Sequence, residues 1–209
     1  MLRILIADDH TVVRKGLKQI LLDEFPTAEI AEVANAEELI KNVMGAHWDV
    51  VVSDLSMPGR SGLDALQQIK ISHPALPVLI LSIHPEEQYA LRALKSGASG
   101  YLSKDTAPDE LVKKKKKVLL GKKYISQSIA EKLANTFSSG TGKSPHESLS
   151  DREFDVMKLL ANGKSVSEIA EMFSLSVTTV STYRARVMAK MELKSNSDLT
   201  RYAIENNLI

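Results

Sequence analysis

Three carboxylates of this sequence stand at the ends of two short apolar runs. Asp8 and Asp9 follow the run at 2–7, and Asp54 closes the run at 50–54. If both runs are parallel strands of one sheet, they end at the edge where open α/β sheets bind ligands. Acidic side chains that converge there repel one another, and a hard divalent cation such as Mg²⁺ would relieve the repulsion. A carboxylate beside such an ion can also act as a nucleophile and become an aspartyl phosphate.

The elements that must position these carboxylates alternate in type up to about residue 120. Apolar runs predict strands at 3–7, 30–34, 50–54, 78–82 and 100–102. Helical periodicity predicts helices at 11–24, 36–44, 62–72, 86–95 and 108–120. Continuous apolar runs such as 79–81 indicate strands that are buried on both faces, as parallel sheets require. The sequence therefore predicts a doubly wound α/β domain with a five-stranded parallel sheet of the flavodoxin-like type.

The bulk properties of the 209 residues exclude several classes of protein. The net charge of +1 gives no overall bias towards nucleic acid or membrane. Cysteine is absent, which excludes disulfides and thiolate metal sites and suits a reducing compartment. We find no secretory signal and no apolar run long enough to span a bilayer. We therefore expect a cytoplasmic protein that makes no contact with a membrane.

A change in composition divides the chain. We expect a first domain at 1–122, a short helix and flexible linker at 123–148, and a small all-α domain at 149–209. The small polar residues at 138–145 are typical of a flexible segment. The lysine run at 113–117 places Lys115 within an apolar helical stripe. The sequence does not decide whether Lys115 snorkels, marks a partner surface or is an engineered change.

Five positions in the first domain, each at a strand end, carry a family resemblance. The acidic pair Asp8-Asp9, then Asp54, Ser82, Tyr101 and Lys104, resemble the receiver domain of two-component response regulators. The resemblance implies that Asp54 accepts a phosphoryl group from a phosphohistidine of a sensor histidine kinase. It further implies that Lys104 neutralises the phosphoryl oxygens, and that Ser82 and Tyr101 change conformation once the group is present.

The same resemblance implies a Mg²⁺ site. Its ligands would be Asp9, Asp54 and the backbone carbonyl of Ser56, with Asp8 acting mainly through a bound water. His10, which follows the acidic pair, could be a further ligand or simply the residue that starts the first helix. The receiver is expected to be a phosphoryl acceptor that promotes its own phosphorylation and dephosphorylation, and not an enzyme.

The second domain resembles the LuxR-type helix-turn-helix. The matching stretches include 149–153, 167–170, 175–176 and 179–183, which place the chain in the NarL/FixJ group of response regulators. Ser150 and Glu153 form a predicted capping box, and Val177 begins the predicted recognition helix. That helix would enter the major groove of duplex DNA. The candidate DNA contacts on it are Thr178, Thr179, Ser181, Thr182, Arg184, Arg186 and Lys190.

The resemblance predicts a transcription regulator that is activated when Asp54 is phosphorylated. The segment 177–194 holds four basic residues and one acidic residue, so a single domain should bind DNA weakly and a homodimer should read an inverted repeat. One alternative is an adaptor whose output is a protein contact, since Ser181 replaces a lysine of many relatives. Another is a small phosphatase or mononucleotide enzyme, although the chain lacks a glycine-rich phosphate loop.

Overall fold

The computed structural model describes residues 1–104, 124, 126, 129–131 and 144–209. The chain divides into two compact units, Met1–Ser138 and Ser139–Ile209. The helix predicted at 108–120, which includes Lys115, lies outside the described residues. So does most of the predicted short helix and flexible linker at 123–148.

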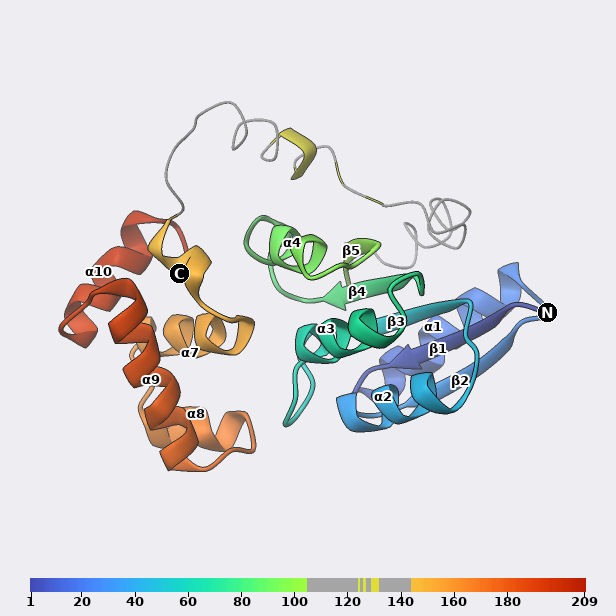
Figure 1. Cartoon of the computed structure of the whole chain (residues 1–209), viewed down its shortest axis with the longest axis horizontal. Coiled ribbons are helices and arrows are strands. Elements are labelled where there is room, and N and C mark those ends of the chain that lie inside the picture. Colours follow the sequence, from blue (N-terminus) through green and yellow to red (C-terminus); the bar gives the residue numbers. More distant parts are fainter. Residues whose placement is uncertain (105–123, 125, 127–128, 132–143) are drawn as a thin grey trace. The chain divides into compact units, whose positions relative to one another are not determined.

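The first unit is built on a five-stranded parallel sheet (Figure 1). Its strands are β1 (Arg3–Ala7), β2 (Glu29–Val33), β3 (Val50–Asp54), β4 (Val78–Ser82) and β5 (Gly100–Ser103), in the order β2-β1-β3-β4-β5. All residues of β3 and β4 are buried, which confirms the prediction of strands covered on both faces. The predicted doubly wound α/β fold is therefore correct.

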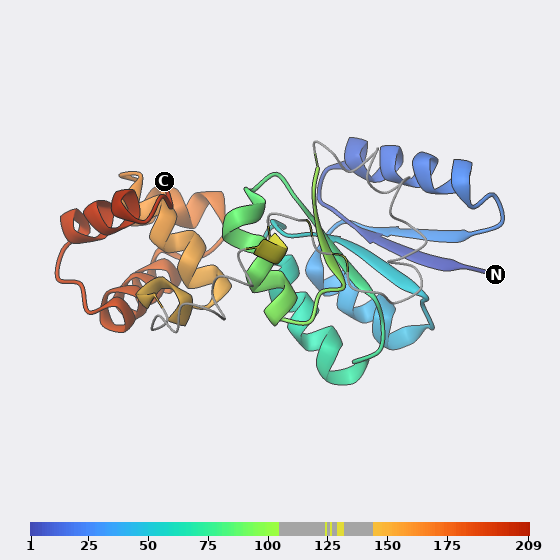
Figure 2. The same cartoon turned by 90° about the horizontal axis from the view of Figure 1, so that it is seen from above.

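Helices cover both faces of the sheet. They are α1 (Thr11–Glu24), α2 (Ala36–Gly45), α3 (Gly62–Ser72) and α4 (Glu86–Lys95). Figure 2 shows α1 on one face and α2 and α3 on the other. On the α1 face, Leu17 and Leu21 pack against alternate residues of the central strands, such as Ile4 and Val52, because successive side chains of a strand point to opposite faces. This packing holds α1 against the central strands of the sheet.

The second unit is helical, as predicted. It consists of the short 3-10 helix η1 (Pro145–Ser148) and the helices α7 (Asp151–Ala161), α8 (Val166–Met172), α9 (Val177–Met191) and α10 (Asn196–Glu205). The predicted capping box is present: Ser150 Oγ accepts from Glu153 N at 3.3 Å, and Glu153 Oε2 accepts from Ser150 N at 2.8 Å. The recognition helix begins at Val177, as predicted. No helix in the described part of either unit is long and apolar enough to cross a membrane.

Candidate functional site

The strand register brings the predicted phosphoryl-site residues together at one edge of the sheet. Ala7 pairs with Ser53, Asp54 with Leu81, and Ser82 with Ser103, so Asp8, Asp54 and Lys104 all lie within two residues of one another along this edge. The backbone N of Lys104 donates to the carbonyl oxygen of Ser82 at 2.8 Å, which anchors the lysine beside β4. This edge is the carboxyl edge, where the sequence predicts the site.

Lys104 bridges two of the predicted carboxylates. Its Nζ lies 2.8 Å from Asp54 Oδ2 and 2.8 Å from Asp8 Oδ2. The side chains of Asp8 and Asp54 are almost fully buried, and that of Lys104 is only 12% exposed. One ammonium group therefore compensates two carboxylates that have little access to water. The arrangement supplies a cation within hydrogen-bond distance of Asp54.

Burial sets the protonation behaviour of this pair. It raises the pKa of Asp54 to about 6, although the hydrogen bond and charge of Lys104 act in the opposite direction. Burial alone would lower the pKa of Lys104, but its bonds to Asp54 and Asp8 outweigh that effect and raise the pKa. At neutral pH Asp54 is consequently ionised and Lys104 is charged. An ionised carboxylate beside a cation is the state that an attack on phosphorus requires.

The acidic cluster also fits a divalent cation. Ligand atoms of Asp8, Asp9, His10 and Asp54 lie within 4.8 Å of one another. The oxygens nearest one another belong to three carboxylates of which Lys104 neutralises two, Asp8 and Asp54. Mg²⁺ prefers oxygen ligands such as carboxylates, and a cation bound among them would reduce the remaining repulsion. The ligand role of the Ser56 carbonyl stays a prediction.

His10 starts α1 and also lies beside the acidic cluster. It is the N-cap residue of α1, as expected for a residue that starts this helix. Its Nδ1 also lies 2.7 Å from Asp9 Oδ1 and 3.3 Å from Asp8 Oδ1, within the acidic cluster. The ring is 64% exposed, so it can turn away when another group occupies the cluster.

Gly62 lets α3 begin directly against Asp54. A Cβ atom at this position would lie 1.9 Å from the carbonyl oxygen of Asp54, far inside van der Waals contact. Ser61 precedes it as the N-cap of α3, with its Oγ accepting from Asp64 N at 3.1 Å. The glycine therefore lets the loop after β3 lie close to the site.

Ser82 and Tyr101, the two predicted switch residues, meet at the backbone of His84. The Ser82 hydroxyl, which is fully buried, accepts from His84 N at 2.9 Å. The Tyr101 hydroxyl donates to the carbonyl oxygen of His84, also at 2.9 Å. A displacement of Ser82 would break a bond to the same residue that holds Tyr101. The structure thus links the two side chains that the sequence predicted to move together.

The His84 side chain makes contacts beside the site that were not predicted from the sequence. Its Nε2 lies 2.8 Å from Ser56 Oγ, and its ring stacks on Tyr89 with the ring centroids 4.8 Å apart. These contacts join the loop after β3 to the loop after β4, on either side of Asp54. The only signal in the sequence is a histidine two positions after Ser82, and spacing alone does not predict its partner.

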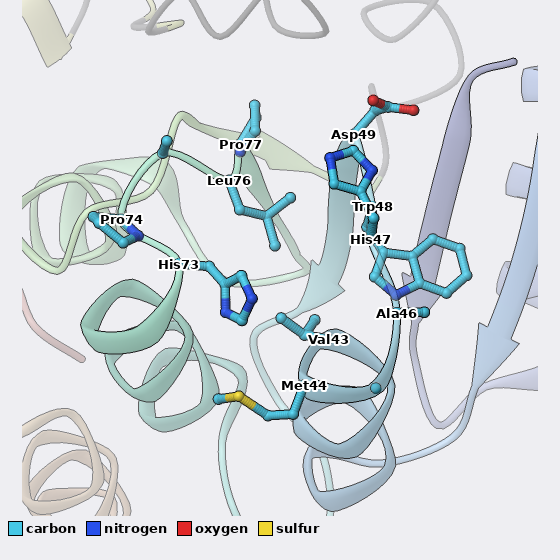
Figure 3. Close-up of a pocket in the computed structure, with 12 residues that line it drawn as sticks. Val43, Met44, Ala46, His47, Trp48, Asp49, His73, Pro74, Leu76 and Pro77 are labelled. Carbon is cyan, nitrogen blue, oxygen red and sulfur yellow. The ribbon is translucent and has the colours of Figure 1, made fainter.

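A hollow of about 630 Å³ lies at the opposite edge of the sheet, near the starts of β3 and β4 (Figure 3). Two connections line it, from α2 to β3 and from α3 to β4, with Val43 and Met44 on one side and His73 and Pro74 on the other. Trp48 Nε1 in its wall donates to the carbonyl oxygen of Asn42 at 3.1 Å. No metal-ligating cluster of the described residues lies here, so the acidic edge remains the candidate site.

In the second unit, α9 has one buried and one exposed face. Val180, Val187 and Met191 are buried and form its core side. The candidate contacts Thr178, Ser181, Thr182 and Arg186 are exposed, whereas Thr179 and Arg184 are half-buried. The predicted set of DNA contacts is therefore not uniform in exposure.

Two of the predicted DNA contacts have partners within the domain. Lys190 Nζ lies 2.6 Å from Glu153 Oε2, and the side chain of Glu153 is only 4% exposed. The Arg184 guanidinium donates to Asn196 Oδ1 at 3.0 and 3.2 Å. Glu153 has a lowered pKa: burial acts to raise it, but the bonds from Lys190 and Ser150 prevail. Lys190 and Arg184 thus support packing between helices, a role that was not predicted from the sequence.

The Lys190 ion pair predicts a stability effect. In Lys190→Met, we expect the amides of α7 and α9 to exchange with deuterium roughly thirtyfold faster, corresponding to about 2 kcal/mol for a lost charged hydrogen bond. Lys194→Met is the matched control, because Lys194 is exposed and its side chain makes no contact that we find among the described residues. Unchanged exchange in Lys190→Met would show that the ion pair does not stabilise the domain.

Comparisons with known proteins match each of the two units to a separate family model. A family model described as "Response regulator receiver domain" matches residues 4–116. A second model, described as "Bacterial regulatory proteins, luxR family", matches residues 147–203. Together the two matches include all of the described site residues.

Similar proteins resemble the chain over its whole length. The response regulator UvrY of Escherichia coli (strain K12) is 35% identical, with 100% of this chain and 96% of UvrY covered. The oxygen regulatory protein NreC of Staphylococcus carnosus (strain TM300) is 36% identical, with 100% and 99% covered. Among solved structures, RcsB of Salmonella enterica serovar Typhimurium, bound to promoter rprA in the presence of phosphomimetic BeF3-, is 26% identical. It has a TM-score of 0.62, with 97% of this chain and 98% of RcsB covered.

Proposed function

The chain belongs to the NarL/FixJ group of two-component response regulators, and we propose that phosphorylation of Asp54 controls its binding to DNA. It is a DNA-binding transcription regulator with a receiver domain, not a member of an enzyme family. The observation that carries the proposal is the contact of Lys104 Nζ with Asp54 Oδ2 and Asp8 Oδ2.

Asp54 acts as the nucleophile in the proposed transfer. One carboxylate oxygen attacks the phosphorus of a phosphohistidine on a sensor histidine kinase, and a P–O bond forms as the P–N bond breaks. The electron pair of that bond leaves with the imidazole nitrogen, which becomes neutral or takes up a proton. Lys104 stabilises the charge that builds on the phosphoryl oxygens in the transition state. With acetyl phosphate as donor, the receiver can promote its own phosphorylation without the kinase: the same P–O bond to Asp54 forms as the P–O bond to acetate breaks, and acetate leaves with the electron pair.

The residues that would hold Mg²⁺ are Asp9 and Asp54, with the Ser56 carbonyl, and Asp8 through a water. A bound Mg²⁺ would neutralise phosphoryl oxygens and relieve the repulsion between the carboxylates. The fit rests on the chemistry of the cluster, in which ligand atoms of Asp8, Asp9, His10 and Asp54 lie within 4.8 Å of one another. His10 is exposed enough to leave the cluster when the site is filled.

Ser82 and Tyr101 transmit the change in the proposed mechanism. The phosphorylated side chain carries up to two negative charges and three acceptor oxygens on phosphorus, in place of the single charge of the Asp54 carboxylate. The Ser82 hydroxyl donates to it, and His84 N loses the acceptor that it has in this structure. The loop that bears His84 then rearranges, which releases the Tyr101 hydroxyl from the His84 carbonyl. Phosphorylation thereby shifts an equilibrium between two conformations of this loop and of β5.

DNA binding by a phosphorylated homodimer completes the proposal. The outer side of α9 is exposed and can enter the major groove. Because the local surplus of positive charge is small, two domains bound to an inverted repeat would reach an affinity that one cannot. The similar protein RcsB is bound to a promoter in the presence of a phosphomimetic, which supports the same coupling here.

Selection of binding sites from sheared genomic DNA tests this function. The full chain is incubated with and without acetyl phosphate plus Mg²⁺, and Asp54→Ala is treated in the same way. We expect a two-fold repeat to be enriched only with the donor and only in the wild type. Absence of enrichment, with Asp54 shown to be phosphorylated, would contradict gated DNA binding and favour an output through protein contact.

A further inference from the structure

The exposed side of the recognition helix carries few charges. Eight residues of α9 are exposed; seven of them, here called the outer face of α9, are Val177, Thr178, Ser181, Thr182, Ala185, Arg186 and Ala189, and the eighth, Lys190, is paired with Glu153. At about 100° per residue most of the seven lie away from the buried side, whereas Val177 is exposed because it stands at the start of the helix. Six of the seven are small, apolar or hydroxyl-bearing, so most of this face offers methyl groups and hydroxyls to a base edge.

The longer polar side chains that flank this face are engaged elsewhere. Arg184 donates to Asn196, and Lys190 is paired with Glu153. Arg186 is the remaining basic residue of the outer face, and it lies in the third turn of the helix. Guanine is most often read by a bidentate Arg or Lys. Over the first two turns of α9 the outer face contains no such side chain and cannot read guanine in that way.

The first turn of a recognition helix is the part that contacts base edges in helix-turn-helix proteins. In α9 this turn begins with Val177, whose side chain is 50% exposed. Thr178 adds a γ-methyl group beside it. Thr179 turns instead towards the helix cap, where its Oγ1 lies 2.7 Å from Ser176 Oγ. An exposed valine at the start of this helix contributes most to the binding free energy where its methyl groups are buried against another apolar group.

Of the groups at base edges in the major groove, the C5-methyl of thymine is the apolar one. We propose that Val177 recognises thymine through this methyl group, and that Thr178 adds to the contact. The inference rests on the proposed DNA binding and deepens it by naming the chemical group that is read. Sequence preference in the first turn of α9 then depends on apolar contact, not on a hydrogen-bond pair.

Uracil substitution tests the proposal, because uracil differs from thymine only by the missing methyl group. The probe is a duplex with the repeat selected above, in which single thymines are replaced by uracil. Full-length phosphorylated protein is titrated and the dissociation constant is measured by fluorescence anisotropy. We expect one or two positions in each half-site where uracil weakens binding about fourfold, equivalent to ~0.8 kcal/mol for one buried methyl group.

The variant Val177→Ala identifies the side chain. It should bind the thymine duplex several-fold more weakly than the wild type, and it should no longer distinguish thymine from uracil at those positions. Arg186→Met is the matched control on the same face: it should weaken binding to both duplexes by the same factor, so that the fourfold difference remains.

The outcomes separate this inference from the function on which it rests. Failure of the phosphorylated protein to bind the thymine duplex would overturn the proposed function. Equal binding of thymine and uracil duplexes at every position would overturn methyl recognition alone. A thymine preference that survives in Val177→Ala would overturn the assignment to Val177.

Discussion

Asp54→Ala should abolish phosphorylation completely. With excess acetyl phosphate and Mg²⁺, the wild type should gain the mass of one phosphoryl group, and the variant should gain none. The physical reason is that neither of the other two aspartates of the cluster combines a bond to Lys104 with any exposure to solvent. Asp54 is bonded to Lys104 Nζ and is 3% exposed, whereas Asp8, which shares the lysine, is fully buried. Asp9 has no bond to the lysine that we find among the described residues.

Intact-mass spectrometry over a time course measures this directly. Asp23→Ala is the matched control, because Asp23 is an exposed carboxylate of α1. That variant should be phosphorylated like the wild type. Circular dichroism should show that Asp54→Ala is folded, since Lys104 retains Asp8 as a partner. A phosphoryl group on folded Asp54→Ala would mean that another carboxylate is the acceptor.

Lys104→Met should slow phosphorylation by about 10²–10³-fold, the usual cost of removing one preorganised electrostatic contact to a transition state. Methionine keeps most of the volume of lysine but has no charge to meet the phosphoryl oxygens. The same substitution leaves Asp8 and Asp54 buried without their cation, so we also expect a less stable receiver in the presence of EDTA. Added Mg²⁺ should restore part of that stability, but not the rate.

The rate is measured with saturating acetyl phosphate and Mg²⁺, again by intact mass. Lys41→Met provides the control, since Lys41 is an exposed residue of α2. An unchanged rate in Lys104→Met would show that the lysine only neutralises the resting carboxylates. A reduced rate that rises again with Mg²⁺ concentration would indicate that the variant has lost metal affinity and not transition-state contact.

Most of the fold of the first unit was predictable because its strands are buried on both faces. Continuous apolar runs marked β1, β3 and β4 with their observed ends. The predicted strand at 30–34 is displaced by one residue, since β2 runs from Glu29 to Val33. Its register explains the difference: Arg3 pairs with Glu29 and Ala7 with Val33, so Ala34 lies beyond the end of β1. Register depends on a partner strand and cannot be read from one run alone.

The candidate site was predictable only where a residue stands at a strand end. That rule brought Asp8, Asp54 and Lys104 to one edge, and the structure joins them there. No such rule predicts side-chain contacts between loops or helices that are far apart in the sequence. The bond between Ser56 and His84 connects residues on two loops, and the Lys190–Glu153 pair connects two helices. These depend on side-chain conformations that no periodicity in the sequence encodes.

The affinity of the full chain for one selected repeat, with and without acetyl phosphate, shows whether Asp54 controls DNA binding. The measurement is a fluorescence anisotropy titration at fixed salt, with the extent of phosphorylation determined by intact mass in the same sample. We expect the donor to lower the dissociation constant at least tenfold in the wild type, about 1.4 kcal/mol of coupling between the two sites, and to leave that of Asp54→Ala unchanged. Equal dissociation constants for the phosphorylated and unphosphorylated wild type would contradict control of DNA binding by Asp54.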